Sequence, residues 1–260
     1  MLAPSREAAK RQILAGRVTV DGAPANKPGR LVATDQNIQI LGPPPKFVSR
    51  SGVKLEAALD QFVIDPKGLI CLDAGSSTGG FTDCLLQRQA AKIYAVDVGT
   101  NQLHERIRSA DRVVVYEKTD IRKVTQQTLG EAVGLLVGDL SFISLRLVMP
   151  ALAALVELEC PLVLLVKPQF EAGRQEASKG KGIISDPAIW QRVLKEVISD
   201  AETHDVTFVN VMVSPITGTA GNIEFVVWFK RSESRASYSQ NRIDEVVAEA
   251  EQTSYEQVST

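Results

Sequence analysis

An apolar run, Leu69–Leu72, passes through Asp73 into a turn of glycine, serine and threonine. Four consecutive apolar residues before such a turn are typical of a strand buried on both faces of a parallel sheet. The turn then enters the helical pattern Phe81–Gln89. A strand, a glycine turn and a helix N-terminus together present backbone N–H groups to a ligand. The stretch therefore predicts an α/β fold with a ligand site at this turn.

The spacing of the glycines argues against two common classes of ligand site. They stand at Gly75, Gly79 and Gly80, which is not the G-x-G-x-x-G spacing of dinucleotide sites. Gly80 is followed by Phe81, and not by the Lys-Ser/Thr pair of a phosphate loop. An acidic residue before the glycines would repel phosphate, whereas it suits an ammonium group. The pattern D-x-G-x-x-x-G-G-F resembles the first motif of class I S-adenosylmethionine methyltransferases, and a plain strand–turn–helix connection is the alternative.

Composition excludes several classes of protein. The 260 residues are enough for one α/β domain and a small appendage. No apolar run approaches the roughly 20 residues of a membrane span, and no signal-peptide pattern follows Met1. The three cysteines are scattered without C-x-x-C spacing, which argues against a disulfide framework or a zinc cluster. We expect a cytoplasmic protein without a metal site.

Charge is distributed unevenly along the chain. Residues 1–54 carry nine Lys or Arg against three acidic residues, whereas residues 231–260 carry three Arg against six acidic residues. A basic segment favours a polyanion such as nucleic acid, although a solvated surface gives the same pattern. We expect residues 231–260 to be a polar, disordered tail, apart from a helix that Ile243–Glu251 could form.

The basic segment has the pattern of a small module at residues 1–43. Arg6–Leu14 reads as a basic helix, and Asp21-Gly22 predicts a hairpin turn. The stretch from Ser5 to Gly22 resembles the small RNA-binding module of a small-subunit ribosomal protein and of pseudouridine synthases. It lacks that family's leading helix, so we expect a module truncated at its start. The resemblance implies RNA contacts from basic side chains, which are Arg6, Lys10, Arg11, Arg17 and Arg50.

Pro43-Pro44-Pro45 predicts an extended linker, residues 44–50, before a larger domain at residues 51–230. In that domain strands and helices alternate, which predicts a doubly wound, mainly parallel sheet. Pro215–Asn222 is too short for a crossover helix, so the last two strands should be antiparallel. Seven strands ending this way resemble the Rossmann-like sheet of S-adenosylmethionine-dependent methyltransferases. The expected strands are 69–73, 92–97, 112–117, 135–140, 161–167, 205–214 and 223–230, and the expected helices are 55–62, 81–89, 101–109, 121–130, 145–157 and 187–201.

Polar residues fall where these strands end, which is the edge at which open α/β sheets bind ligands. Asp97 can accept hydrogen bonds from two ribose hydroxyls, and Asp120 can accept from an adenine amino group. Asp139 and Lys167 end the fourth and fifth strands, and Glu224 opens the last. Each aspartate alone could equally be a cap or turn residue, but their common phase favours a site. The expected cofactor contacts are Asp73, Gly75, Ser77, Thr78, Gly79, Gly80, Phe81, Asp97, Val98, Asp120, Ile121 and Asp139.

Four segments make the resemblance specific: Ser-Arg-Ser-Gly-Val-Lys ending at Lys54, Asp-Leu-Ser-Phe-Ile-Ser-Leu from Asp139, Leu-Val-Lys-Pro-Gln-Phe-Glu around Lys167, and Gly-Asn-Ile-Glu-Phe around Glu224. They resemble the TlyA family of ribosomal RNA 2′-O-methyltransferases, historically labelled hemolysins, which have an FtsJ-like catalytic domain. The resemblance implies a catalytic tetrad of these four residues and S-adenosyl-L-methionine as methyl donor. It also implies ribosomal RNA or ribosomal subunits as partner, with methylation at cytidine.

These residue types suit the implied reaction. A ribose 2′-hydroxyl is a poor nucleophile. Holding it in line with the methyl group should therefore account for most of the rate enhancement. Lys167 could lower the proton affinity of the hydroxyl or accept its proton, while Asp139 and Glu224 fix the lysine and the hydroxyl. Lys54 could hold a phosphate or complete the ion network. The segment Gly173–Ile184 could be a lid with RNA contacts or a solvated insertion.

Two other functions stay open at this point. A membrane-lytic hemolysin would need a membrane-active segment, and the sequence displays none. A non-catalytic RNA-binding ribosome-assembly factor would have no need of two acids and two lysines at these strand ends.

Overall fold

The computed structural model describes residues 2–3, 6–14, 16–42, 45–218, 220–232 and 240–258. It divides into two compact units, Met1–Lys46 and Phe47–Thr260. Phe47 is buried in the core of the second unit, where burial of its ring stabilises the fold. The prediction that residues 47–50 belong to a linker is therefore wrong, while Pro43 and Pro44 lie outside the described residues.

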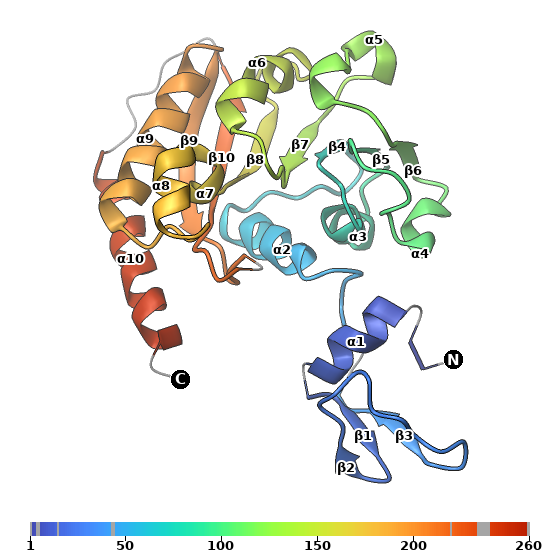
Figure 1. Ribbon diagram of the computed structural model, residues 1–260. Helices are drawn as coiled ribbons and strands as arrows, with labels where there is room; N and C mark the ends of the chain where they lie inside the picture. The colour runs from blue at the N-terminus through green and yellow to red at the C-terminus, as the bar shows by residue number, and fades with distance from the viewer. Residues whose placement is uncertain are drawn as a thin grey trace. The chain divides into compact units, whose positions relative to one another are not determined.

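The N-terminal unit combines helix α1 (Arg6–Leu14) with a three-stranded antiparallel sheet in the order β2-β1-β3 (Figure 1). Its strands are β1 (Val18–Val20), β2 (Ala23–Pro24) and β3 (Ile38–Ile40). Asp21 and Gly22 form the turn between β1 and β2 with φ angles of 50° and 81°, which confirms the predicted hairpin. A small core holds the unit together, formed by Val18, Val20 and Ala25 with Ile13, Ile38 and Ile40 packed against it.

The second unit is built on a seven-stranded sheet in the order β6-β5-β4-β7-β8-β10-β9 (Figure 1). Its strands are β4 (Ile70–Ala74), β5 (Lys92–Val96), β6 (Val113–Tyr116), β7 (Leu135–Gly138), β8 (Pro161–Val166), β9 (Val206–Val213) and β10 (Phe225–Arg231). Strands β4 to β8 pair in parallel, and β10 is antiparallel to β8 and β9. The predicted alternation and the antiparallel last pair are confirmed. The strand order reverses beside β4, which is where such sheets bind ligands.

Helices cover both faces of this sheet (Figure 1). On one face, α2 (Ser51–Gln61) and α3 (Gly80–Gln87) bury Leu55 and Phe81. On the other, α6 (Leu145–Ala154) and α9 (Pro187–Glu202) bury Met149 and Trp190. The shorter elements are α4 (Glu105–Arg108), η1 (Ile121–Lys123), α5 (Gln126–Leu129), α7 (Pro168–Glu171) and α8 (Arg174–Lys179). None of the helices in the described part of the chain has the length and apolarity needed to cross a bilayer.

Two predicted helices are shorter than expected because polar caps begin them late. His104 caps α4, so residues 101–104 of the expected helix 101–109 lie outside it. In the expected helix 121–130, Val124 and Thr125 are extended, and Thr125 forms a capping box with Thr128 that starts α5 anew.

Helix α10 (Gln240–Val258) contains the helix considered at Ile243–Glu251, and its greater length corrects the expectation that the rest of the tail is disordered. Ile243, Val246, Val247 and Ala250 are buried in the core that α9 and β9 share. Arg242 donates to the Val211 carbonyl oxygen on edge strand β9 at 2.8 Å. The buried positions follow the spacing of an amphipathic helix, so an apolar stripe holds this helix on the core although the tail as a whole is polar. Residues 233–239 and 259–260 lie outside the described residues.

Candidate active site

The glycine turn places a buried carboxylate at the carboxyl end of β4. Asp73 is fully buried, and its Oδ2 accepts a hydrogen bond from Thr82 Oγ1 at 2.6 Å. Its Oδ1 is buried without a hydrogen-bond partner among the described groups. Burial raises the pKa of Asp73 to about 7. Gly75 has a φ of 84°, and a Cβ there would lie 3.0 Å from the Asp139 carbonyl oxygen, so this close approach requires glycine.

Asp97 lies beside the glycine turn, as the strand-end pattern predicted. Its Oδ2 accepts from the Ser77 N–H at 2.8 Å, and its Oδ1 accepts from the Gly99 N–H at 2.6 Å. The side chain is half-buried, and Val98 next to it is 72% exposed. Strand β5 thus brings a carboxylate and an apolar side chain to the edge of the turn formed by residues 75–79.

The Asp120 carboxylate forms an ion pair with the neighbouring Arg122. Arg122 donates to both carboxylate oxygens, with its Nη2 2.6 Å from Oδ2, and this bonding lowers the pKa of Asp120 to about 2. Asp120 also caps η1 through the Arg122 N–H. An adenine contact at this carboxylate would have to compete with, or add to, the Arg122 pair.

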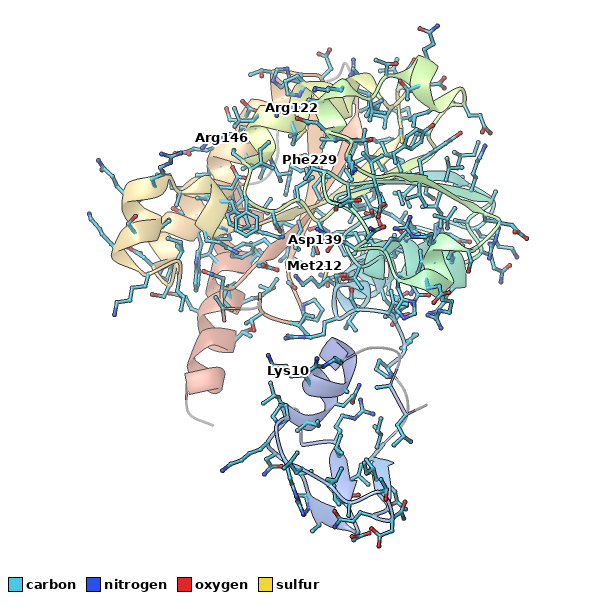
Figure 2. The ribbon with its side chains drawn as sticks, turned by 45° about the vertical axis from the view of Figure 1, so that its right-hand side comes forward. Lys10, Arg122, Asp139, Arg146, Met212 and Phe229 are labelled. Atoms are coloured by element: carbon cyan, nitrogen blue, oxygen red, sulfur yellow. The ribbon has the colours of Figure 1, made fainter. Side chains whose placement is uncertain are left out.

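The four residues of the expected tetrad form two buried ion pairs. Lys54 Nζ lies 2.5 Å from Glu224 Oε2, and Lys167 Nζ lies 2.7 Å from Asp139 Oδ1. The side chains are 9%, 3%, 9% and 16% exposed in that order, so these charges are largely withdrawn from water. Asp139, which Figure 2 labels, directly follows the last residue of β7. The structure therefore brings each predicted lysine to a predicted acid.

Two polar side chains that the sequence patterns did not single out extend this network. Ser141 Oγ lies 2.7 Å from Lys167 Nζ as its acceptor. Gln169 Nε2 donates to Glu224 Oε1 at 3.5 Å, while its Oε1 is buried without a partner among the described groups. Gln169 follows Lys167 by two residues, so it links the Lys167 segment to the Lys54–Glu224 pair.

Close packing between α2 and α3 explains why Lys54 reaches the site. A Cβ on Gly52 would lie 2.4 Å from the Phe47 ring, and one on Gly80 would lie 2.1 Å from Ser51 Oγ. Asp83, which is 3% exposed, accepts from the Val48 N–H at 2.8 Å. The Ser-Arg-Ser-Gly motif is therefore a packing motif that delivers the Lys54 side chain to the sheet edge.

An exposed aromatic ring lies next to the Lys167–Asp139 pair. Phe142 is 92% exposed and has a φ of 63°, an uncommon backbone conformation for a residue other than glycine. Its ring centroid lies 5.1 Å from that of Phe170, and Lys167 Nζ lies 5.7 Å from the Phe170 ring centroid. A flat apolar surface thus faces outward beside the paired charges.

Some of the side chains expected to contact RNA are exposed, and others form hydrogen bonds within the protein. Arg6 and Lys10 are exposed on α1, where Figure 2 labels Lys10. Arg17 Nε donates to the Leu41 carbonyl oxygen at 3.0 Å and so closes the N-terminal unit. Arg50 donates to the Thr217 carbonyl oxygen in the second unit. The side chain of Arg11 lies outside the described residues.

The segment Gly173–Ile184 contains helix α8 and is fastened where it ends. Asn222 accepts from the Ile184 N–H at 2.9 Å and donates to the Gly182 carbonyl oxygen at 2.8 Å. Three cations of the segment remain exposed, Arg174, Lys179 and Lys181. The segment therefore presents these charges to solvent, while Asn222 fixes the end at which it leaves.

The residues at the turn fit S-adenosylmethionine. Asp73 Oδ1 is a buried acceptor without a partner among the described groups, which suits an ammonium group, and Asp97 offers carboxylate oxygens at the position expected for a ribose. Gly75 places no side chain at the point where the turn passes close to Asp139. Among the described residues, no group of three His, Cys, Asp or Glu side chains is placed to hold a metal ion.

Gly218 gives a first test of the geometry around Glu224. A Cβ at this position would lie 2.5 Å from Glu224 Oε1, and Glu224 is fixed by Lys54. We expect Gly218→Ala to displace the carboxylate and to lower kcat about tenfold or more, with unchanged cofactor affinity. Gly134→Ala, whose Cβ meets its nearest atom at 3.4 Å, is the matched control. Equal kcat values for the two variants would show that the Glu224 position is not critical.

Comparison with known proteins adds independent findings. Residues 47–231 match the FtsJ-like methyltransferase family, and residues 1–38 match the S4 domain. The 16S/23S rRNA (cytidine-2′-O)-methyltransferase TlyA of Mycobacterium tuberculosis (strain ATCC 25618 / H37Rv) is 42% identical to this chain, with 90% of this chain and 88% of that protein covered. Hemolysin A of Brachyspira hyodysenteriae is 41% identical, with 86% of this chain and 93% of that protein covered. A solved structure of a hemolysin-named protein from Streptococcus thermophilus gives a TM-score of 0.82 at 39% identity, covering 97% of this chain and 93% of that one.

Proposed function

Because this chain belongs to the FtsJ-like methyltransferase family and carries an S4 domain at its N-terminus, we propose that it methylates the ribose 2′-hydroxyl of cytidine in ribosomal RNA, with S-adenosyl-L-methionine as donor. The nucleotide and the RNA are those named for the Mycobacterium tuberculosis relative. The observation that carries the proposal is the pairing of two buried lysines with two carboxylates at the sheet edge. A ribosomal substrate would place the protein in the cytoplasm.

The donor supplies a methyl group bonded to a positively charged sulfur, which an oxygen nucleophile can attack. Asp73 would bind the ammonium group of the donor, and Asp97 would bind its ribose hydroxyls. Val98 and Ile121 would line the adenine, with Asp120 beside them. The N–H groups and small side chains of the turn, at Gly75, Ser77, Thr78, Gly79, Gly80 and Phe81, would enclose the rest.

The tetrad would act on the ribose hydroxyl. Lys167, which Asp139 and Ser141 hold in place, would stabilise the negative charge that develops on the 2′-oxygen. Glu224, oriented by Lys54 and Gln169, would hold the hydroxyl in line for attack. Burial of these groups strengthens their electrostatic effect, because water no longer screens them. The exposed ring of Phe142 would give an RNA base a surface to stack on.

The N-terminal unit would supply phosphate contacts from α1. Replacing both Arg6 and Lys10 by alanine should weaken RNA binding and reduce the slope of log affinity against log salt by about one for each phosphate that is no longer neutralised. The affinity for S-adenosylmethionine should not change, since both side chains belong to the N-terminal unit. A filter-binding titration at several salt concentrations measures this slope.

Lys27→Ala is the matched control for that experiment, because Lys27 is an exposed cation of the same unit outside α1. An equal loss of affinity in the control would mean that total charge, and not the face of α1, determines binding.

The reaction itself is tested by transfer of a tritiated methyl group from S-adenosylmethionine to separated ribosomal subunits and to assembled ribosomes. A 2′-O-methyl group blocks alkaline cleavage of the adjacent phosphodiester, so label should be recovered in alkali-resistant dinucleotides that begin with cytidine. Label in alkali-sensitive mononucleotides would indicate base methylation and contradict the proposal. No label in any particle, despite cofactor binding, would support a non-catalytic assembly factor.

A further inference from the structure

Two chain segments carry the Asp139–Lys167 pair. The first is the loop 139–144, which leaves β7 and ends at Ser144, the N-cap of α6. The second is the turn 167–171, which leaves β8 through Lys167 and forms α7. The first half of the loop reaches the second segment through Asp139 and Ser141, which both contact Lys167 Nζ at 2.7 Å.

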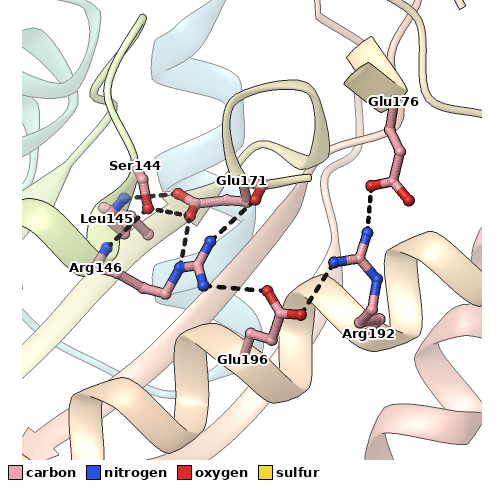
Figure 3. Close-up of polar contacts among 7 residues, drawn as sticks. All are labelled: Ser144, Leu145, Arg146, Glu171, Glu176, Arg192 and Glu196. Atoms are coloured by element: carbon pink, nitrogen blue, oxygen red, sulfur yellow. Dashed lines mark hydrogen bonds and ion pairs between the residues drawn. The ribbon is translucent and has the colours of Figure 1, made fainter. Parts of the chain in front are cut away.

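Glu171 joins the far ends of the same two segments. Its carboxylate accepts from Ser144 Oγ at 2.5 Å and from the Leu145 N–H at 2.6 Å (Figure 3). The residue is 4% exposed, and burial raises the pKa of its carboxyl. The two hydrogen bonds offset the cost of removing the carboxylate from water. A carboxylate at the first turn of α6 is also placed favourably against the helix dipole. The loop 139–144 is therefore held at both ends by residues of the turn 167–171.

Arg146 supports the carboxylate from the solvent side. Its Nε lies 3.7 Å from Glu171 Oε2, and its Nη2 donates to the Glu171 carbonyl oxygen at 3.1 Å. Figure 3 shows the ion pairs continuing outward, with Arg146 Nη1 3.1 Å from Glu196 and Glu196 3.0 Å from Arg192. Arg192 in turn pairs with Glu176 of α8. Arg146 thus connects Glu171 to Glu196. Glu196 itself pairs with Arg146 and Arg192, which both lie outside the loop 139–144.

We propose that Glu171 is a positioning residue that fixes the loop 139–144, and with it Asp139 and Ser141, against Lys167. The proposal rests on the methyltransferase function proposed above. The loop spans only residues 139–144, and Phe142 within it adopts a φ of 63°. Such a conformation persists only when the surrounding contacts hold it. Glu171 supplies the contacts at the end of the loop opposite to Lys167.

The matched variants are Glu171→Gln and Glu196→Gln, because both remove a carboxylate that pairs with Arg146. Only Glu171→Gln removes a charged group that accepts hydrogen bonds from the end of the loop. Its kcat should therefore fall about 10- to 100-fold, which corresponds to the free energy of a hydrogen bond to a charged group. Its KM for S-adenosylmethionine should change less than its kcat, since Asp73 and Asp97 keep their own hydrogen bonds. Hydrogen exchange should accelerate in the peptide 139–145 of Glu171→Gln and stay unchanged there in Glu196→Gln.

Ser144→Ala tests the proposal without removing the buried acid. It should lower kcat by a smaller factor than Glu171→Gln, with faster exchange in the same peptide, and it decides the matter where Glu171→Gln does not fold. Wild-type kcat in Glu171→Gln or in Ser144→Ala would overturn the proposal, as would an equal loss in Glu196→Gln. If the wild-type protein methylates no RNA, the proposed function fails, and exchange in 139–145 alone decides whether Glu171 fixes the loop.

Discussion

Replacing Lys167 by alanine should lower the rate of methyl transfer about 10²- to 10³-fold, the range typical of removing a group that stabilises charge in the transition state. Lys167 Nζ pairs with Asp139 and donates to Ser141, so its removal takes the cation from the centre of this part of the site. The variant would leave Asp139 largely buried without that cation, so it should also be less stable. Cofactor affinity, measured by calorimetry, should be unchanged because the glycine turn follows a different strand, β4.

Lys92→Ala is a suitable control for that experiment. Lys92 also pairs with a carboxylate, that of Glu131, but it lies at the beginning of β5, the opposite end of the strand from Asp97. It should keep wild-type activity. Methyl transfer by Lys167→Ala within a few-fold of the Lys92→Ala rate would contradict the role assigned to the tetrad.

Replacing Asp73 by asparagine should remove a loss of stability that the wild-type protein undergoes as pH rises. The native pKa of Asp73 is about 7, whereas its ordinary value is 3.8. Between these values the native state keeps a proton that the unfolded state has lost, so stability declines as pH rises from about 4 to about 7. At pH 8 the difference corresponds to roughly 4 kcal/mol. Asparagine can still accept from Thr82 Oγ1, so the variant should melt several degrees above the wild type at pH 8 but not at pH 4.

The same substitution should reduce affinity for S-adenosylmethionine. The carboxylate can accept from the donor's ammonium group through Oδ1, whereas an amide that accepts from Thr82 would turn its NH₂ group toward that ammonium. Wild-type affinity should rise with pH through the pKa of Asp73, and that rise should be absent in Asp73→Asn. A variant with unchanged affinity, or with lower stability than the wild type at pH 8, would contradict this account of Asp73.

The architecture of the second unit follows closely from periodicity and spacing. Each expected strand corresponds to an observed one, because buried parallel strands are short apolar runs and glycine turns mark their ends. The antiparallel end of the sheet follows from the eight residues Pro215–Asn222 alone. The family resemblances are likewise confirmed by the FtsJ-like and S4 matches. The helix considered at Ile243–Glu251 is present, because Ile243, Val246 and Ala250 carry the helical spacing, but its extension to Gln240–Val258 was not predicted, since the overall polarity of the tail indicated disorder.

The pairing within the site could not be predicted in full. The sequence indicates which polar residues end strands, but it does not indicate that Lys54 selects Glu224 while Lys167 selects Asp139. Ser141, Gln169 and Glu171 lie inside the quoted motifs, yet their roles depend on side chains from distant segments. Glu171 was concealed in this way, because an acid within a motif at a strand end gives no sign that it will cap a helix 26 residues earlier.

The most direct test of the proposed function is nucleoside mass spectrometry of ribosomal RNA after incubation with S-adenosylmethionine and either the wild-type protein or Lys167→Ala. We expect 2′-O-methylcytidine to accumulate with the wild-type protein and to stay at background with the variant. A methylated base in place of a methylated ribose, or 2′-O-methylcytidine at equal levels with both proteins, would contradict it.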